Sequence, residues 1–223
     1  MILTGVDNSM VMDEKKLIIF DLDGTLIDAY PAIIDSFNYA MQKFGYKIQK
    51  PLTIRKAVGK GDRLLLKPYV KRRDLDKVLM AYRRHHRKSL VKYSSLFAGV
   101  ENTLRYLKRR GHKLAVASNR PTEFSQILLK HLKIKKYFDY VLCADKLKIG
   151  KPNPTILNKI LRKFKLNPSQ AVYVGDMVID VQTGKRAKVD TIIVTTGSSS
   201  KSEIKAQKPA IIIDNIKELK RIF

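Results

Sequence analysis

The sequence predicts an α/β fold, a parallel sheet with helices on both faces and an all-helical insert after the first strand. Three observations predict this fold. Short continuous apolar runs recur along the chain, and such runs indicate strands that are covered on both faces. Helical patterns connect most of these runs. The long interval after the first run, residues 29–96, has no strand-like run.

The elements of the sheet follow in chain order. The strand-like runs are 17–20, 114–117, 140–143, 171–174, 191–194 and 210–213. The helices expected between them are 100–110, 121–132, 154–164 and 179–187. Gly111 follows the first of these helices and prolines open the next two, as is typical of helix ends and helix starts.

The interval after the first strand is predicted to be an inserted helical unit. Within 31–44, Ile33, Ile34, Phe37, Met41 and Phe44 fall at helical spacing, which indicates an amphipathic helix. A second helix of this kind is expected farther on, with Leu75, Val78, Leu79, Tyr82 and Tyr93 on its apolar face. We therefore expect a core formed by 1–28 and 97–223 and a helical cap at 29–96.

The net charge is the anomaly of the composition. The formal net charge is +25, and the segment 29–96 has 17 basic against 4 acidic residues, a net of +13. A positive field raises the local concentration of anionic ligands, which include nucleic acid, acidic lipid headgroups and small phosphate esters. We expect a small anionic ester ahead of nucleic acid, although the charge does not exclude nucleic acid, and the charge says nothing about oligomeric state.

The chain is expected to be a cytoplasmic protein without a membrane partner. Its one cysteine, Cys143, lies in an apolar run and excludes an intramolecular disulfide. The apolar runs are much shorter than the roughly 20 residues of a membrane helix, and the first residues lack the pattern of a secretory signal. Because Met10 and Met12 precede the first strand, we expect the leading residues to be either a loose extension or a misplaced start.

Two carboxylates follow the first strand. Asp21 and Asp23 are two residues apart, so their side chains project to one side of an extended chain at the carboxyl end of the strand. Ligands of open α/β sheets bind at that end. Two close carboxylates repel each other when ionised and therefore call for a cation, a shared proton or a paired base. Taken alone, Asp-Gly-Thr also suits an ordinary turn.

Further polar residues follow other strands at equivalent positions. These are Ser118 and Asn119, then Lys151 in a loop with two prolines, then Asp176 and Asp180 one helical turn apart. Singly, each has a plain structural interpretation as a helix cap, a solvated charge or a surface helix residue. Together they place a hydroxyl, an amine and carboxylates over one sheet edge, which indicates an active site.

These motifs together resemble the haloacid dehalogenase superfamily, whose pattern is Asp-x-Asp-Gly-Thr, then Ser or Thr, then Lys, then Gly-Asp-x-x-x-Asp. The resemblance covers nearly the whole chain and implies a Rossmann-like core with an inserted cap. Spacing and cap size are most similar to the phosphoglycolate phosphatase-like branch. The chain departs from the branch pattern at several positions: Ala29, Tyr30, Met177, Thr183, Gly184 and Lys188.

The resemblance also implies a reaction, the Mg²⁺-dependent hydrolysis of small phosphate monoesters through an aspartyl-phosphate. Asp21 is expected to be the nucleophile and Asp23 the general acid and base. Ser118, Lys151 and the amide of Asn119 are expected to hold the phosphoryl oxygens. The expected Mg²⁺ ligands are Asp21, the Asp23 carbonyl and Asp176, with Asp180 as a further ligand or a support. Thr25 and Asp28 are expected to be structural.

The substrate is the open part of this interpretation. The glycine-flanked loop 58–63 could place Lys60 or Arg63 on an anionic substrate, or it could be a plain turn between helices. His85 and His86 are interpreted as a solvated helix face. A phosphoglycolate-like ester is favoured, and a nucleotide, pyrophosphate or sugar-phosphate phosphatase is the alternative. A basic nucleic-acid-binding protein on a catalytically silent core is the alternative from another class.

Overall fold

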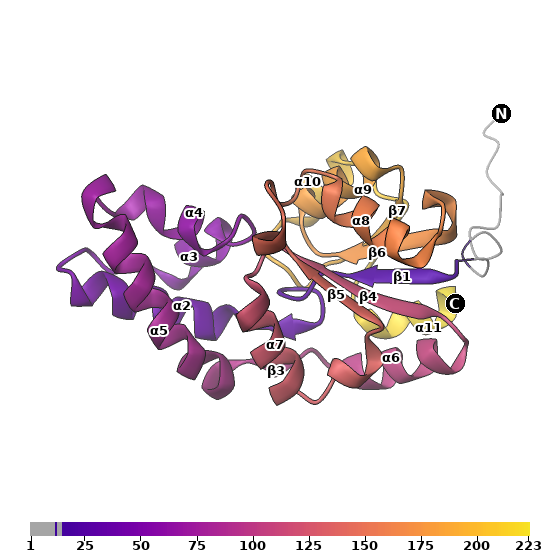
Figure 1. Ribbon diagram of the computed structural model, residues 1–223, viewed down its shortest axis with the longest axis horizontal. Helices are drawn as coiled ribbons and strands as arrows, with labels where there is room; N and C mark the ends of the chain where they lie inside the picture. Colours follow the sequence, from indigo (N-terminus) through magenta and orange to yellow (C-terminus); the bar gives the residue numbers. More distant parts are fainter. Residues whose placement is uncertain (1–11, 13–14) are drawn as a thin grey trace.

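The structure is a computed structural model that describes residue 12 and residues 15–223 (Figure 1). The leading segment expected to be loose therefore lies outside the described residues, apart from Met12. The side chain of Met12 is buried in the main hydrophobic core.

The central element is a six-stranded parallel sheet in the order β5-β4-β1-β6-β7-β8. Its strands are β1 (Leu17–Phe20), β4 (Lys113–Ser118), β5 (Tyr140–Cys143), β6 (Ala171–Gly175), β7 (Asp190–Val194) and β8 (Ile211–Ile213). The predicted runs match these strands to within one residue at each end. The α/β fold class predicted from the sequence is confirmed.

Both faces of the sheet are covered, which explains the continuous apolar runs. Ile18 and Phe20 of β1 enter one hydrophobic core, whereas Leu17 and Ile19 enter another on the opposite face. The first core is closed by α6 (Val100–Arg109), α7 (Thr122–His131) and α11 (Leu219–Ile222). The opposite face is covered by α8 (Thr155–Phe164), α9 (Val178–Ala187) and α10 (Lys201–Ala206) (Figure 1).

Short 3₁₀ turns complete the connections. In the sheet region they are η3 (Lys135–Tyr137), η4 (Ala144–Lys146), η5 (Pro168–Gln170) and η6 (Ile216–Glu218).

The inserted segment is helical, as predicted, and forms the indigo to purple part on the left of Figure 1. Its elements are α2 (Tyr30–Lys43), α3 (Pro51–Ala57), α4 (Asp62–Leu66), η1 (Lys67–Tyr69), η2 (Arg72–Asp74) and α5 (Leu75–Tyr93). Helices α2 and α5 pack against each other, with Phe37 and Met41 facing a core that includes Val78. Phe44 and Tyr93, both expected on the apolar faces, lie at the helix ends and are 36% and 39% exposed.

A two-stranded ribbon joins the insert to the sheet region. Strands β2 (Ile27–Asp28) and β3 (Ser95–Leu96) pair antiparallel, so the chain leaves and returns at adjacent points. Strands of two residues are too short to produce a periodic signal, which is why the sequence did not predict them. The division into a core of 1–28 and 97–223 and a cap of 29–96 stays a prediction, and this ribbon lies at its boundaries.

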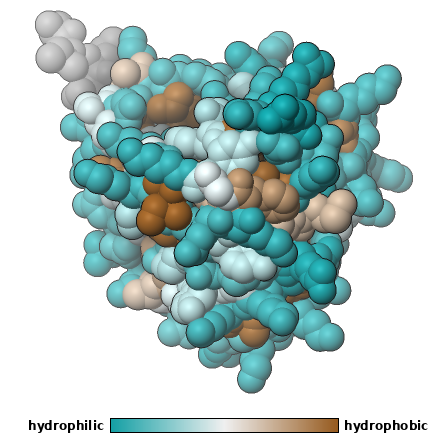
Figure 2. Space-filling model, turned by 90° about the vertical axis from the view of Figure 1, so that its left-hand side faces the viewer, coloured by the Kyte–Doolittle hydropathy of each residue, from teal (hydrophilic) through white to brown (hydrophobic). Residues whose placement is uncertain are grey.

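The surface at the insert end is predominantly hydrophilic, with separate hydrophobic side chains between the polar ones (Figure 2). Among the described residues, no helix is both long enough and apolar enough to cross a membrane.

Candidate active site

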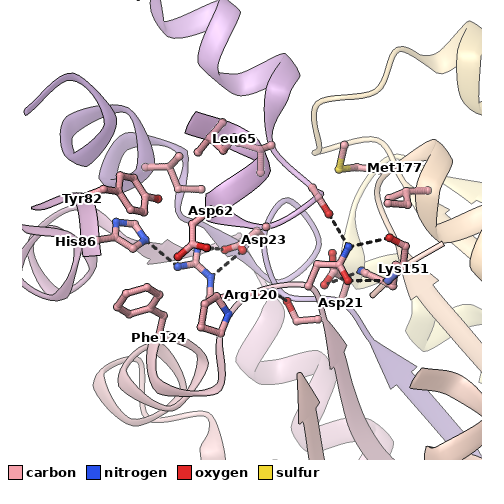
Figure 3. A pocket seen from close by; sticks show the side chains of 18 residues that line it. Asp21, Asp23, Asp62, Leu65, Tyr82, His86, Arg120, Phe124, Lys151 and Met177 are labelled. Carbon is pink, nitrogen blue, oxygen red and sulfur yellow. Dashed lines mark hydrogen bonds and ion pairs between the residues drawn. The ribbon is translucent and has the colours of Figure 1, made fainter. Parts of the chain in front are cut away.

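The carboxyl ends of β1, β4 and β6 bring most of the predicted site residues together (Figure 3). The Asp21 amide donates to the Val174 carbonyl at 2.9 Å, which continues the pairing of β1 with β6 up to Asp21. The turn that follows requires Gly24, whose φ is +84°. A Cβ atom on Gly24 would lie 2.3 Å from Asp176 Oδ2, so glycine allows the turn to approach that carboxylate.

Three buried carboxylates form the centre of the site. Asp21, Asp176 and Asp180 each place a carboxylate oxygen within 4.8 Å of the others. The Lys151 ammonium lies among them, with Nζ 3.1 Å from Asp21 Oδ1 and 2.8 Å from Asp180 Oδ1. The cluster thus holds three acidic groups against one buried ammonium, which favours a further cation.

The pKa values of these groups reflect that imbalance. Burial raises the pKa of Asp21 to about 6, with the Lys151 charge opposing and the Asp180 charge adding to the shift. Burial, together with the charges of Asp180 and Asp21, raises the pKa of Asp176 well above its usual range. Burial alone lowers the pKa of Lys151, but the carboxylates of Asp180 and Asp21 more than offset it and raise the pKa overall.

Hydrogen bonds separate the roles of the two downstream carboxylates. Asp180 accepts from Lys151 Nζ, from the Tyr173 hydroxyl at 2.7 Å, and from the amides of Asp176 and Met177 at 3.2 and 3.0 Å. Asp176 Oδ1 accepts from the Thr25 hydroxyl at 2.8 Å, whereas Asp176 Oδ2 is buried without a partner among the described residues. Asp176 is therefore open to a ligand, and Asp180 is held by donors on both oxygens.

These residues fit a hard divalent cation. The donor set consists of oxygens, as Mg²⁺ prefers, and the cluster has an excess of negative charge. The unpartnered Asp176 Oδ2 supplies an oxygen for such an ion. Asp21 and Asp176 would hold Mg²⁺ directly, and Asp180 would orient Lys151 and the turn that positions Asp176.

Asp23 lies outside this carboxylate cluster. Its two oxygens accept from Arg120 Nη2 at 2.7 Å and from Arg120 Nε at 2.8 Å. The sequence interpretation missed Arg120, although the residue directly follows Ser118 and Asn119 at the same strand end. The predicted contact of the Asp23 carbonyl with Mg²⁺ stays a prediction.

The polar pair at the end of β4, Ser118 and Asn119, holds neighbouring loops in place. Ser118 is buried, and its hydroxyl accepts from the Arg120 amide at 3.2 Å. The Asn119 side chain donates to the Gly59 carbonyl at 2.8 Å and accepts from the Lys151 amide at 2.8 Å. Asn119 therefore connects the insert with the loop that positions Lys151.

These residues line a small cavity of about 60 Å³ between the sheet edge and the insert. The predicted site residues Asp21, Asp23, Ser118, Asn119 and Lys151 are among its lining residues. The insert supplies the walls of the cavity, and most of its lining residues are apolar or aromatic. They include Ile33, Val58, Leu65, Tyr82 and His86, together with the acidic Asp62.

The two cations predicted from the insert do not reach this cavity. The loop 58–63 lines it with Val58, Gly59, Gly61 and Asp62. Lys60 is exposed, and Arg63 forms an exposed ion pair with Asp76.

The interpretation of His86 as solvated is wrong. His86 is 1% exposed and lies between Arg120 and Ser36, whereas its neighbour His85 bonds to Asp35. The helical spacing of the sequence did indicate a buried position, because His86 continues the apolar stripe of Leu79, Tyr82 and Leu90 on α5.

Comparisons with known proteins agree with this arrangement. The model of the haloacid dehalogenase-like hydrolase family matches residues 18–194. A phosphoglycolate phosphatase of Aquifex aeolicus is 34% identical, over 82% of this chain and 85% of its own length. A phosphoglycolate phosphatase of Aliivibrio fischeri is 32% identical, over 94% of this chain and 96% of its own length. The crystal structure of a predicted phosphoglycolate phosphatase from Haemophilus somnus superposes with a TM-score of 0.89 at 27% identity, over 94% of this chain and 98% of that one. This chain belongs to the haloacid dehalogenase-like hydrolase family.

Proposed function

We propose that this hydrolase is a phosphatase that transfers the phosphoryl group of a small phosphate monoester to Asp21 and then to water. The observation that supports this most is the buried cluster of Asp21, Asp176 and Lys151, with Asp23 held separately beside it. A carboxylate nucleophile needs positive charge to meet a phosphate dianion. The cluster provides Lys151 and a set of oxygens that fit Mg²⁺.

The first half of the reaction moves the phosphoryl group to the protein. The Asp21 carboxylate attacks phosphorus, the bond to the ester oxygen breaks, and Asp23 gives its proton to the departing alkoxide. Ser118, the Asn119 amide and Lys151 hold the phosphoryl oxygens. Mg²⁺, when bound, offsets the charge of the phosphate and of the carboxylates around it.

The second half returns Asp21 to its starting state. Asp23, now a carboxylate, takes a proton from a water molecule that attacks the phosphorus of the aspartyl-phosphate. The acyl-phosphate bond breaks, inorganic phosphate is released, and Asp21 is again a free carboxylate. Because each half moves one proton through Asp23, its position is as important as that of Asp21.

Among substrates, a phosphoglycolate-like ester is favoured. The relatives from Aquifex aeolicus and Aliivibrio fischeri carry the name phosphoglycolate phosphatase. The cavity is small, about 60 Å³, so it favours a small leaving group with the insert in this position. A cytoplasmic location stays a prediction, and so does the expectation of a small ester ahead of nucleic acid as the partner.

A phosphate-release screen tests the proposal. The purified protein is assayed on phosphoglycolate, a nucleoside monophosphate, pyrophosphate and a sugar phosphate, with Mg²⁺ and with a chelator. We expect Mg²⁺-dependent release that is fastest on phosphoglycolate, and Asp21→Asn should lower kcat by at least about a thousandfold. Asp214→Asn is the matched control, since that carboxylate is exposed, and it should keep wild-type activity.

Two results would count against the proposal. Unchanged turnover in Asp21→Asn would show that Asp21 is not the nucleophile. Faster phosphate release from another ester would contradict only the preference for phosphoglycolate.

A further inference from the structure

A line of buried polar groups connects Asp23 to the insert (Figure 3). Arg120 binds both oxygens of Asp23 at 2.7 and 2.8 Å, and its third nitrogen, Nη1, lies 2.9 Å from His86 Nε2. On the other side of the ring, His86 Nδ1 lies 2.9 Å from the Ser36 hydroxyl. Ser36 in turn donates to the Ala32 carbonyl at 2.8 Å.

The direction of each hydrogen bond in this line is fixed by chemistry. A guanidinium can only donate, so His86 Nε2 must be the acceptor and carry no proton. The ring proton therefore lies on Nδ1 and is donated to the Ser36 oxygen, whose own hydrogen points to Ala32. His86 is thus a neutral ring in one defined tautomer.

The line is also held rigidly. Tyr82 stacks on the His86 ring at 4.9 Å, and Phe124 meets the ring edge-on at 5.1 Å. Ser36 is fully buried, and Arg120 is only 7% exposed. A guanidinium bound at three nitrogens has little freedom to rotate, and the carboxylate that it grips shares this restriction.

The two ends of the line belong to different parts of the molecule. Arg120 follows β4 of the sheet, whereas His86 lies on α5 and Ser36 on α2 of the insert. Arg120 can therefore reach His86 only when the insert is docked on the sheet edge as it is here. Asp23 in turn lines the cavity between the two parts.

We propose that Arg120 is a positioning residue that aims Asp23 at the leaving group, and that His86 and Ser36 make this aim depend on the docked insert. The inference rests on the proposed function, because it assumes that Asp23 moves protons. A carboxylate has about four acceptor positions, and Arg120 takes two, so Asp23 keeps positions for the substrate.

The test compares two esters without a carboxylate, ethyl phosphate and p-nitrophenyl phosphate. Ethoxide is a strong base that must be protonated as it leaves, whereas p-nitrophenolate leaves unaided. The ratio kcat/KM reports the steps through alcohol release. We expect Arg120→Met to lower kcat/KM about 100-fold on ethyl phosphate and about fivefold or less on p-nitrophenyl phosphate.

The second half-reaction provides a separate readout. If Asp23 is badly placed, it no longer activates water efficiently, so the aspartyl-phosphate should accumulate. Arg120→Met should then show a burst of p-nitrophenolate of about one equivalent per active site, followed by slow turnover. A defect confined to folding would lower the active fraction and the burst together.

Matched variants separate positioning from general damage. Arg83→Met removes another arginine that pairs with a cavity carboxylate, Asp62, without contacting Asp23, and it should affect both esters equally. Arg120→Lys should recover part of the ethyl phosphate activity. His86→Phe keeps the ring contacts but loses the acceptor for Arg120. We expect a loss of ethyl phosphate activity that is smaller than in Arg120→Met, and in the double variant it should add little to the effect of Arg120→Met.

Three results would overturn the inference. One is an equal loss on both esters in Arg120→Met. Another is a loss only on phosphoglycolate through a higher KM, which would make Arg120 a substrate-binding residue. The third needs no turnover: ¹⁵N NMR of wild-type His86 should show the proton on Nδ1, and a proton on Nε2 would break the line. If the wild-type protein hydrolyses none of the esters, the proposed function fails. The NMR measurement of the His86 tautomer still tests separately whether the hydrogen-bonded line from Asp23 to Ser36 exists.

Discussion

His86 is a titratable side chain that the fold keeps neutral. Burial and the adjacent Arg120 charge lower its pKa from 6.5 to about 2. The ring is 1% exposed and makes a hydrogen bond at each nitrogen. The folded protein therefore resists protonation of this ring, whereas the unfolded chain does not.

This difference predicts a pH-dependent stability. Because the folded pKa is lowered, the contribution of His86 is complete above pH 6.5 and is lost as the pH falls from 6.5 towards 2. Between pH 7 and pH 5, wild type should lose about 2 kcal/mol more unfolding free energy than His86→Phe. Denaturant unfolding at the two pH values measures this, and equal losses in both proteins would contradict the account.

At the residue scale, sequence reasoning found groups that follow strands and missed groups whose role needs two distant elements. Asp21, Ser118 and Asp176 are brought together because parallel strands end at one sheet edge. Arg120 and His86 meet only through the docking of the insert, which no local pattern encodes. The stripe on α5 did indicate that His86 faces inward, but its cationic neighbours in sequence favoured a solvated interpretation.

At the element scale, the packing of α2 on α5 builds one wall of the cavity. Phe37 is fully buried at this contact and meets Tyr69 edge-on at 5.2 Å. The same helix positions Ile33, which lines the cavity, and Ser36, which holds His86. The shape of the site thus depends on apolar contacts away from the reacting groups.

Phe37→Ala should therefore lower the unfolding free energy by about 3–5 kcal/mol, because it leaves a cavity between α2 and α5. Phe44→Ala is the control on the end of the same helix. Its side chain is 36% exposed, so the loss should be much smaller. Chemical denaturation monitors both variants, and similar losses would show that α2 does not depend on its buried face.

Loops that join the insert to the sheet edge were only partly predictable. The sequence left open whether the segment 58–63 places Lys60 or Arg63 on the substrate or forms a plain turn, and this segment contributes Val58, glycines and Asp62 to the cavity. A second contact was not expected: Arg55 donates to the carbonyls of Thr196 and Gly197 at 3.0 and 3.2 Å and lies over the Tyr30 ring. Such contacts depend on how two parts dock, and residue type alone does not determine that.

At the scale of the whole molecule, the sequence predicted the sheet well because periodicity and burial agree along every strand. Continuous runs such as 171–174 are apolar on both faces since each face has its own core. The helical insert was also predictable from its spacing. The net charge of +25 was less informative, because a positive field attracts anions without distinguishing them.

Asp21 lies where the fold and the site meet. It directly follows β1 in the middle of the sheet and faces Lys151 and Asp176. It also lies two residues before Asp23, the carboxylate that Arg120 holds. Covalent phosphorylation of Asp21 can be tested directly.

The decisive measurement is a rapid acid quench of wild type and Asp23→Asn during turnover of ³²P-labelled p-nitrophenyl phosphate, whose leaving group needs no proton, followed by borohydride reduction and peptide mapping. Borohydride converts an aspartyl-phosphate to homoserine. We predict homoserine at position 21, with more label in Asp23→Asn because its water-activating carboxylate is lost. Covalent label at another residue, or turnover by both proteins without label at Asp21, would contradict the account.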